Sequence, residues 1–124
     1  MSIPVDVSRL AEALGDFGSG YLLSVSGQGR VKAVTVDPVV RAGVLEVPGP
    51  SRGTAANVAG NAAVTLVFPP AQLYGYTLIV DGVAQVAGEG FVVTPETAVL
   101  HRPAAHADGP PPTDGCGHDC RPVG

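Results

Sequence analysis

The sequence predicts a small, mainly β domain, a closed barrel of about six antiparallel strands with two short helices. Its apolar residues are small: there is no Trp, with three Phe and three Tyr, so Val, Ala and Leu must supply the core. Runs rich in β-branched residues are separated at even intervals by Gly, Pro and Asp. A length of 124 residues is typical of one domain. An open sandwich of the same strands is the alternative.

The first expected element is a helix. Apolar residues recur at helical spacing over residues 7–14, which places them on one face of a short amphipathic helix. Asp6 or Ser8 would cap its start, and Gly15 supplies a stop.

Six runs with β character follow: 21–26, 31–36, 44–47, 64–68, 76–86 and 91–93. The turn between the first two is short enough for a hairpin. Asp81 and Gly82 interrupt the fifth run, where we expect a β-bulge. Val99 and Leu100 form either a last strand or a short helix capped by Thr94, and we favour the strand.

Charge and hydropathy exclude several classes of partner. The net charge is −4 and Lys32 is the single lysine, so the clustered cations that nucleic acids or anionic membranes require are missing. The N-terminus lacks the charged start and long apolar run of a signal peptide, and no window approaches a membrane span. These features predict a cytoplasmic protein. Apolar side chains on the outer wall would favour dimerisation, namely Val34, Val36, Leu66 and Ile79.

Residues 51–67, SRGTAANVAGNAAVTLV, predict a short capped helix that runs into a strand. The start of a helix exposes unpaired N–H groups and carries a partial positive charge. Ser51 adds a hydroxyl, Arg52 adds a bidentate donor, and Gly53 lets the backbone approach closely. This arrangement is suited to a phosphate group. The simpler interpretation is that Ser51 is only a helix cap and Arg52 a solvated surface residue.

Taken in order, GRVKAVTV, GVLEVPGPSRGTAANVAGNAAVTLVFPP and GYTLIVDGVAQVAG resemble the pyridoxamine 5′-phosphate oxidase-like split-barrel family of flavin-binding proteins. The resemblance covers roughly residues 21–100. It implies a homodimer of six-stranded antiparallel split β-barrels. A flavin such as FMN, or a deazaflavin in some branches, would lie in a groove at the dimer interface.

The resemblance also implies a set of cofactor-binding residues, carried over by position: Arg30, Lys32, Ser51, Arg52, Thr54 and Asn57. Thr54 stands where many members carry a lysine, and it offers a hydrogen bond without a charge. Because Trp is absent, Tyr74 and Tyr76 are the candidates for stacking on the flavin ring, and the favoured alternative is that they are interface or core aromatics. Lys32 lies on an otherwise apolar strand face, where it either extends to the rim or reaches a ligand. Asn57 either bonds locally or contacts the ligand.

The composition changes after Arg102, and the sequence predicts a domain of residues 1–102 followed by a Pro/Gly-rich, flexible tail of residues 103–124. The tail contains CGHDC, with three zinc-type ligands at alternate positions: Cys116, His118 and Cys120. A fourth zinc ligand would have to come from His101, His106 or a second chain. Two exposed thiols, or a reversible disulfide between them, are the other interpretations.

Two functions follow from these observations. The first is a flavin- or deazaflavin-dependent oxidoreductase that transfers a hydride to or from a small molecule, with the chemistry supplied by the cofactor. The second is a non-catalytic split barrel that binds or sequesters a small ligand, such as a cofactor, haem or a metal. The predicted barrel shows no Ser-His-Asp, Cys-His or paired-carboxylate arrangement, so the sequence identifies no catalytic residue.

Overall fold

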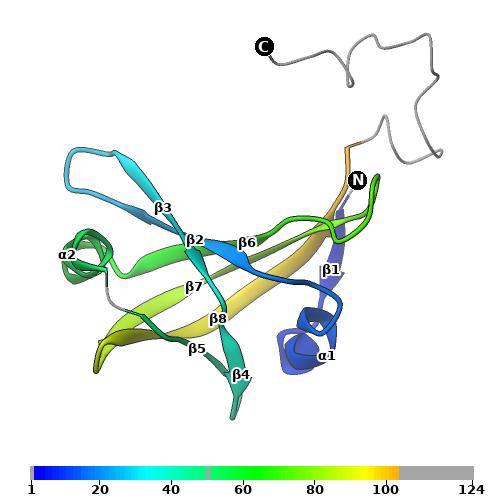
Figure 1. The fold of residues 1–124 in the computed structure, drawn as a ribbon, viewed down its shortest axis with the longest axis horizontal. Coiled ribbons are helices and arrows are strands. Elements are labelled where there is room, and N and C mark those ends of the chain that lie inside the picture. Colours follow the sequence, from blue (N-terminus) through cyan, green and yellow to red (C-terminus); the bar gives the residue numbers. More distant parts are fainter. Residues whose placement is uncertain (1, 50, 104–124) are drawn as a thin grey trace, which may run out of the picture.

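The computed structural model describes residues 2–49 and 51–103, which form one antiparallel sheet flanked by short helices (Figure 1). Its strands are β1 (Ser2–Val5), β2 (Gly20–Val25), β3 (Val31–Val36), β4 (Val39–Arg41), β5 (Val44–Val47), β6 (Ala63–Phe68), β7 (Thr77–Ala87) and β8 (Gly90–His101). The strand order is β3-β2-β6-β7-β8-β5-β4, and β1 pairs with β8. The helices are η1 (Val7–Arg9), α1 (Leu10–Leu14) and α2 (Arg52–Gly60).

The mainly β fold and all six expected strands are confirmed, with two additions. β1 and β4 were not predicted, and the runs 91–93 and 99–100 belong to one long strand, β8, so the alternative helix capped by Thr94 is wrong. The expected bulge is present between Asp81 and Gly82. The strand order ends at β3 and β4, and no ladder joins these two strands in the described part of the chain. The sheet is therefore a split barrel, which confirms the fold implied by the family resemblance; the closed barrel expected from the strand spacing alone is wrong.

The core lies on the inner face of the curved sheet, because side chains alternate between the two faces of each strand. Its fully buried apolar residues include Leu22, Leu45, Leu66, Phe68, Leu78, Val80 and Val93. Two residues expected on the outer wall are part of this core: Leu66 is 0% exposed and Val36 is 7% exposed. Val34 also packs against the core, and Ile79 alone of the four lies on the outer face. In β3 and β6, the faces that point into the core are therefore the ones that the sequence analysis placed on the outside.

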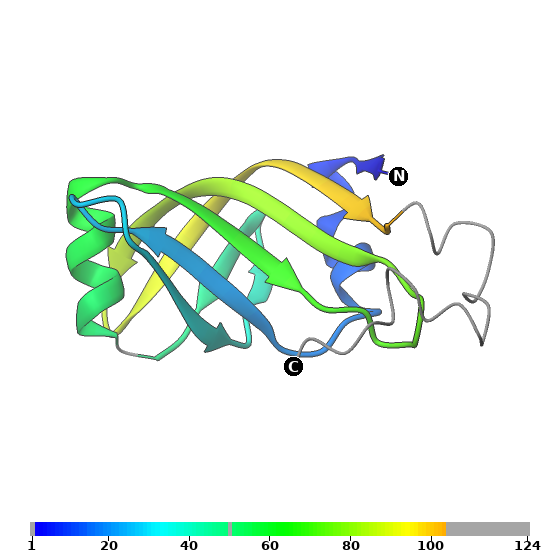
Figure 2. The same cartoon turned by 90° about the horizontal axis from the view of Figure 1, so that it is seen from above.

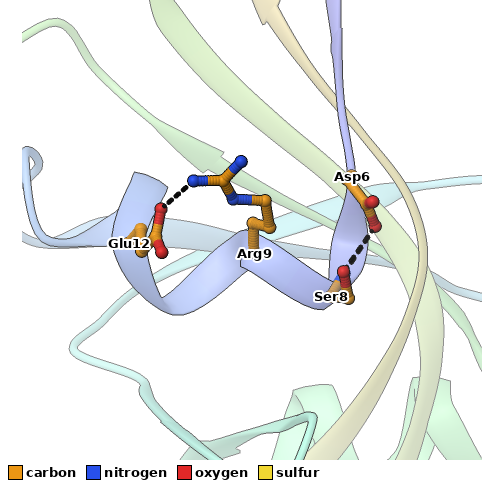
Figure 3. A network of polar contacts seen from close by, with 4 residues as sticks. All are labelled: Asp6, Ser8, Arg9 and Glu12. Carbon is orange, nitrogen blue, oxygen red and sulfur yellow. Dashed lines mark hydrogen bonds and ion pairs between the residues drawn. The ribbon is translucent and has the colours of Figure 1, made fainter.

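Asp6 caps the first helical turn, as predicted. Its carboxylate accepts hydrogen bonds from the backbone N–H of Ser8 at 2.9 Å and from the Ser8 hydroxyl at 2.8 Å (Figure 3). Arg9 and Glu12 form an exposed ion pair one turn apart, at 2.9 Å. Gly15 follows the last residue of α1 and ends it.

α2 connects β5 to β6 and lies at the opposite end of the sheet from α1 (Figures 1 and 2). It contacts β2, β3 and β7. Thr54 and Val58, one turn apart, are its buried residues. None of the helices in residues 2–49 and 51–103 has the length and hydropathy to cross a membrane. The cytoplasmic location stays a prediction.

Candidate functional site at the start of α2

Ser51 is the N-cap of α2, and its hydroxyl is shared with Thr54. Ser51 has extended backbone geometry, and its Oγ accepts the Thr54 backbone N–H at 3.4 Å while donating to Thr54 Oγ1 at 2.9 Å. Thr54 is fully buried. The structure thus places Thr54 inside the cap, without the exposed surface that a ligand contact needs.

Lys32 reaches the same turn of α2 from a different element. It lies on the inner face of β3, and its side chain extends across Gly53. A Cβ atom built on Gly53 would lie 2.7 Å from Cε, 3.0 Å from Cδ and 3.1 Å from Nζ of Lys32. The missing side chain of Gly53 therefore forms a cradle that the lysine fills. An ammonium group beside the free amides of a helix is a donor set suited to phosphate.

The charges at this end of α2 are unbalanced. Arg52 is the first residue of the helix and is exposed, and the first turn contains no acidic residue. Within the described residues, the side chains of Lys32 and Arg52 have no hydrogen bond or ion pair. Two cations beside the positive end of a helix dipole repel one another and the dipole. An anion bound there would be attracted by both cations and by the helix dipole.

A small cavity adjoins this turn and brings in a segment that the sequence did not indicate. It has a volume of about 150 Å³ and is lined by Ser51, Arg52, Ala55, Val86, Gly88, Glu89, Gly90 and Phe91. Its far wall is the connection between β7 and β8, which only the tertiary fold brings to α2. Glu89 is a carboxylate on this wall, but it forms no ion pair with Arg52. No local motif marks the β7–β8 connection, so sequence reasoning had no signal for it.

The other two candidates of this set lie further from the helix start. Asn57 Nδ2 donates to the hydroxyl of the buried Ser24 at 3.0 Å, so this amide attaches α2 to β2. Arg30 follows the β2–β3 turn, where its backbone N–H bonds the Ser26 hydroxyl at 3.1 Å and its side chain is exposed. The structure thus brings Lys32, Ser51 and Arg52 together, and Asn57 is turned towards the sheet.

Tyr74 and Tyr76 are not near α2 in the single chain. They belong to the loop between β6 and β7, at the opposite end of the sheet (Figures 1 and 2). The Arg102 guanidinium lies 4.5 Å from the centroid of the Tyr76 ring, and its Nη1 donates to the Tyr74 carbonyl at 3.5 Å. Both tyrosines are half-buried in this arrangement.

Larger cavities lie elsewhere, and one of about 510 Å³, between α1 and β4, includes Phe17, Asp37 and Val40 in its lining. Residues 2–49 and 51–103 contain no group of three or more potential metal-binding His, Cys, Asp or Glu residues. The predicted zinc ligands Cys116, His118 and Cys120, with His106, lie outside the described residues. His101 is within them, and its Nδ1 is 3.1 Å from the Ser2 hydroxyl.

Relatives with high sequence similarity come from mycobacteria. An uncharacterized protein of Mycobacterium bovis and one of Mycobacterium tuberculosis are each 40% identical over 132 residues, covering 94% of this chain and 92% of each relative. No family model matches the chain.

Solved structures with the same fold have low sequence identity. A FAD-binding protein of Mycobacterium smegmatis has a TM-score of 0.59 at 16% identity, covering 82% of this chain and 100% of that one. HutZ, the haem storage protein of Vibrio cholerae, has a TM-score of 0.58 at 15% identity, with coverages of 77% and 93%. A candidate pyridoxamine 5′-phosphate oxidase of Listeria innocua has a TM-score of 0.54 at 14% identity, with coverages of 77% and 92%.

An F420 reductase has a TM-score of 0.52 at 15% identity, covering 75% of this chain and 93% of that one. These structures share a fold whose members include flavin-, deazaflavin- and haem-associated proteins. The fold therefore agrees with the resemblance found in the sequence. The chain belongs to the family of the two mycobacterial proteins, and its fold is the pyridoxamine 5′-phosphate oxidase-like split barrel.

Proposed function

We propose that this protein binds FMN or a deazaflavin through a phosphate group at the start of α2 and is an oxidoreductase. The observation that carries the proposal is the pair of cations, Lys32 and Arg52, beside a helix N-terminus that has no acidic residue in its first turn. The likeness of the fold to a FAD-binding protein and an F420 reductase supports the same class of ligand.

Residues from two elements, α2 and β3, would bind the phosphate group. Arg52 would pair with phosphate oxygens from the helix side, and the Lys32 ammonium would approach from β3. Ser51 would hold the first turn of the helix so that its free amides face the phosphate. When bound, the flavin or deazaflavin would supply hydride transfer, and the protein would supply orientation and electrostatics.

A second copy of the chain is part of the proposal. The cavity at α2, of about 150 Å³, is smaller than the roughly 300 Å³ at which pockets for ligands of this size begin. We propose that it receives the phosphate end of a flavin, with Ser51 and Arg52 in its lining and Lys32, which is not part of the lining, approaching from β3. The ring system then needs a further surface. The chain has such a surface in its outer apolar face, which also contains one hydrogen-bonded polar pair, Thr65 and Asp81. The apolar residues of this face are Tyr21, Leu23, Val25, Val31, Val67, Ile79, Val83 and Val99. We propose that this face forms a homodimer and that the ring lies along the junction.

Titration of the purified protein with FMN and with a deazaflavin, followed by fluorescence, tests the proposal. We expect at least micromolar affinity for one of them. Arg52→Ala should weaken this affinity by about tenfold to a hundredfold, because a charge-assisted contact is lost. Arg9→Ala is the matched control, since Arg9 is also an exposed arginine on a helix but lies on the α1 side. Absence of binding to both cofactors contradicts the proposal.

Haem binding without catalysis is the second candidate. The likeness to the haem storage protein HutZ and the neutral, buried Thr54 in place of a lysine favour it. Titration with haemin separates the two functions, because haem ligation shifts the Soret absorption band. We expect no such shift at stoichiometric haemin, and a saturable shift together with no flavin binding would favour haem storage.

A further inference from the structure

We infer that Gly53 is a positioning residue, whose missing side chain holds the Lys32 ammonium at the phosphate end of the cofactor. The inference rests on the proposed function and extends it. The predicted consequence is discrimination between FMN and riboflavin, which differ in the phosphate group.

The contact geometry carries this inference. The three heavy atoms nearest to a Cβ on Gly53 are all from Lys32: Cε at 2.7 Å, Cδ at 3.0 Å and Nζ at 3.1 Å. Real Cβ atoms essentially never approach another atom to 2.7 Å, so any side chain at residue 53 requires movement. The atoms that must move are the far end of a flexible lysine, whereas at Gly20 they would include a phenylalanine ring and the backbone carbonyl of Val67. Alanine at residue 53 should therefore displace Lys32 and leave the fold unchanged.

Because Gly53 lies within a helix, the presence of glycine there needs a physical reason. Glycine is unfavourable within a helix relative to alanine because it loses more conformational freedom on folding. Gly53 does not have a positive φ angle, so its backbone conformation is open to any L residue. The close approach of Lys32 is the feature at this position that a glycine satisfies. The end of the lysine side chain lies beside the first turn of α2, where its ammonium would meet an anion bound at the helix start.

The test compares wild type, Gly53→Ala, Lys32→Ala and the double variant. Gly60→Ala is the matched control, because it adds the same methyl group to the same helix and a Cβ there meets no atom within 4 Å. FMN and riboflavin affinities are measured by fluorescence quenching, and the thermal midpoint of unfolding is measured without ligand. Inorganic pyrophosphate serves as a competitor, so phosphate recognition is also measured without the flavin ring.

We expect Gly53→Ala to weaken FMN binding by about tenfold with little change for riboflavin, because one charge-assisted contact is misplaced. The double variant should bind FMN no more weakly than Lys32→Ala, since both changes remove the same contact. The thermal midpoint of Gly53→Ala should be unchanged or higher by up to about 5 °C, owing to the better helix propensity of alanine. Gly60→Ala should retain wild-type affinity.

The possible failures are distinguishable. FMN binding by Gly53→Ala at wild-type affinity, or additive losses in the double variant, overturns the role of Gly53 and leaves the proposed function standing. A lower thermal midpoint together with equal losses for FMN and riboflavin shows structural damage and also overturns it. Absence of flavin binding and of pyrophosphate competition in the wild type contradicts the proposed function itself, and this inference with it.

Discussion

Asp6 stands between β1 and η1, and its carboxylate accepts both the backbone N–H and the hydroxyl of Ser8 (Figure 3). The backbone hydrogen bond, and then the hydroxyl, hold the pKa of Asp6 below its usual value, because they favour the charged form. A lowered folded-state pKa stabilises the protein above the unfolded-state pKa, and this contribution is lost as the pH falls through the folded-state pKa. Acidification below about pH 4 should therefore weaken this cap, and Asp6 should keep its charge to a lower pH than an ordinary aspartate does.

The prediction at this residue is that Ser8→Ala raises the pKa of Asp6 towards the usual value. The variant keeps the backbone hydrogen bond and removes the hydroxyl, so a partial rise is expected. Side-chain carboxyl chemical shifts in an NMR titration measure it directly. Ser19→Ala, a serine removed from a loop away from this cap, is the control. An Asp6 pKa that is identical in wild type and Ser8→Ala would contradict the assignment.

Single residues of the candidate site were predictable to different degrees. The pattern around residues 51–54 indicated an anion site, and Lys32 stood out as a lone charge on an apolar strand face. The burial of Thr54 was predictable, because Thr54 and Val58 are four residues apart and therefore share one face of α2, the buried one. The hydrogen bond of Asn57 was not predictable, because its partner Ser24 is 33 residues away and only the fold brings the two together.

At the scale of elements, α2 is attached to the sheet by little apolar surface. It buries Thr54 and Val58, and Asn57 adds one hydrogen bond to the hydroxyl of Ser24, which is fully buried. Removing one partner of such a pair costs more than removing both, because a buried polar group is left unsatisfied. The orientation of the start of α2 depends on this small set of contacts.

We therefore predict that Asn57→Ala destabilises the protein by about 1–3 kcal/mol. Ser24→Ala should cost less, and the double variant should cost less than the sum of the two single changes. Urea denaturation followed by circular dichroism measures all three free energies of unfolding. Asn61→Ala is the comparison for an exposed hydrogen bond beside the same helix, since Asn61 is exposed and its Oδ1 accepts the Ala63 backbone N–H at 3.1 Å. Strict additivity of the two single changes would show that the Asn57–Ser24 hydrogen bond carries no coupling energy.

The two elements that sequence reasoning missed have a common physical reason. β1 has four residues, including Pro4, which lacks a backbone donor, and β4 has three residues. Three residues are too few to show the alternation of a strand, so β4 gave no signal, whereas β1, which is as long as the predicted β5, was masked by its proline. β4 pairs with β5 across Ala42 and Gly43, whose φ angles are both positive. This turn geometry is typical of tight hairpins, but Ala-Gly is not the usual sequence for it.

At the scale of the whole molecule, the evenly spaced turn signals predicted the mainly β fold class but a closed barrel, and only the family resemblance implied the open, split form. Closure depends on whether the first and last strands in space can meet, and β3 and β4 are separated in the sheet by five other strands. The alternation phase had the same difficulty. Both faces of β3 and β6 carry apolar residues, so the sequence did not indicate that Val36 and Leu66 point into the core.

The outer apolar face crosses β3, β2, β6, β7 and β8, which makes it a property of the assembled sheet. Cross-strand register places Tyr21 opposite Thr35 on one side and Val67 on the other, so Tyr21 lies well inside this face. Tyr21 is 43% exposed in the single chain, so its side chain is not required by the core. A charge introduced there would be solvated in a monomer and buried in a dimer, where an unpaired charge is strongly unfavourable.

Tyr21→Glu should therefore convert a dimer into a folded monomer, as measured by size-exclusion chromatography with light scattering. Leu73→Glu is the matched control, because Leu73 is 83% exposed and lies in the β6–β7 loop outside this face. Circular dichroism verifies that both variants fold. If the second copy completes the cofactor groove, Tyr21→Glu also weakens FMN binding and leaves pyrophosphate binding at α2 intact. A wild-type monomer at micromolar concentration, or a dimeric Tyr21→Glu variant, would exclude this face as the interface.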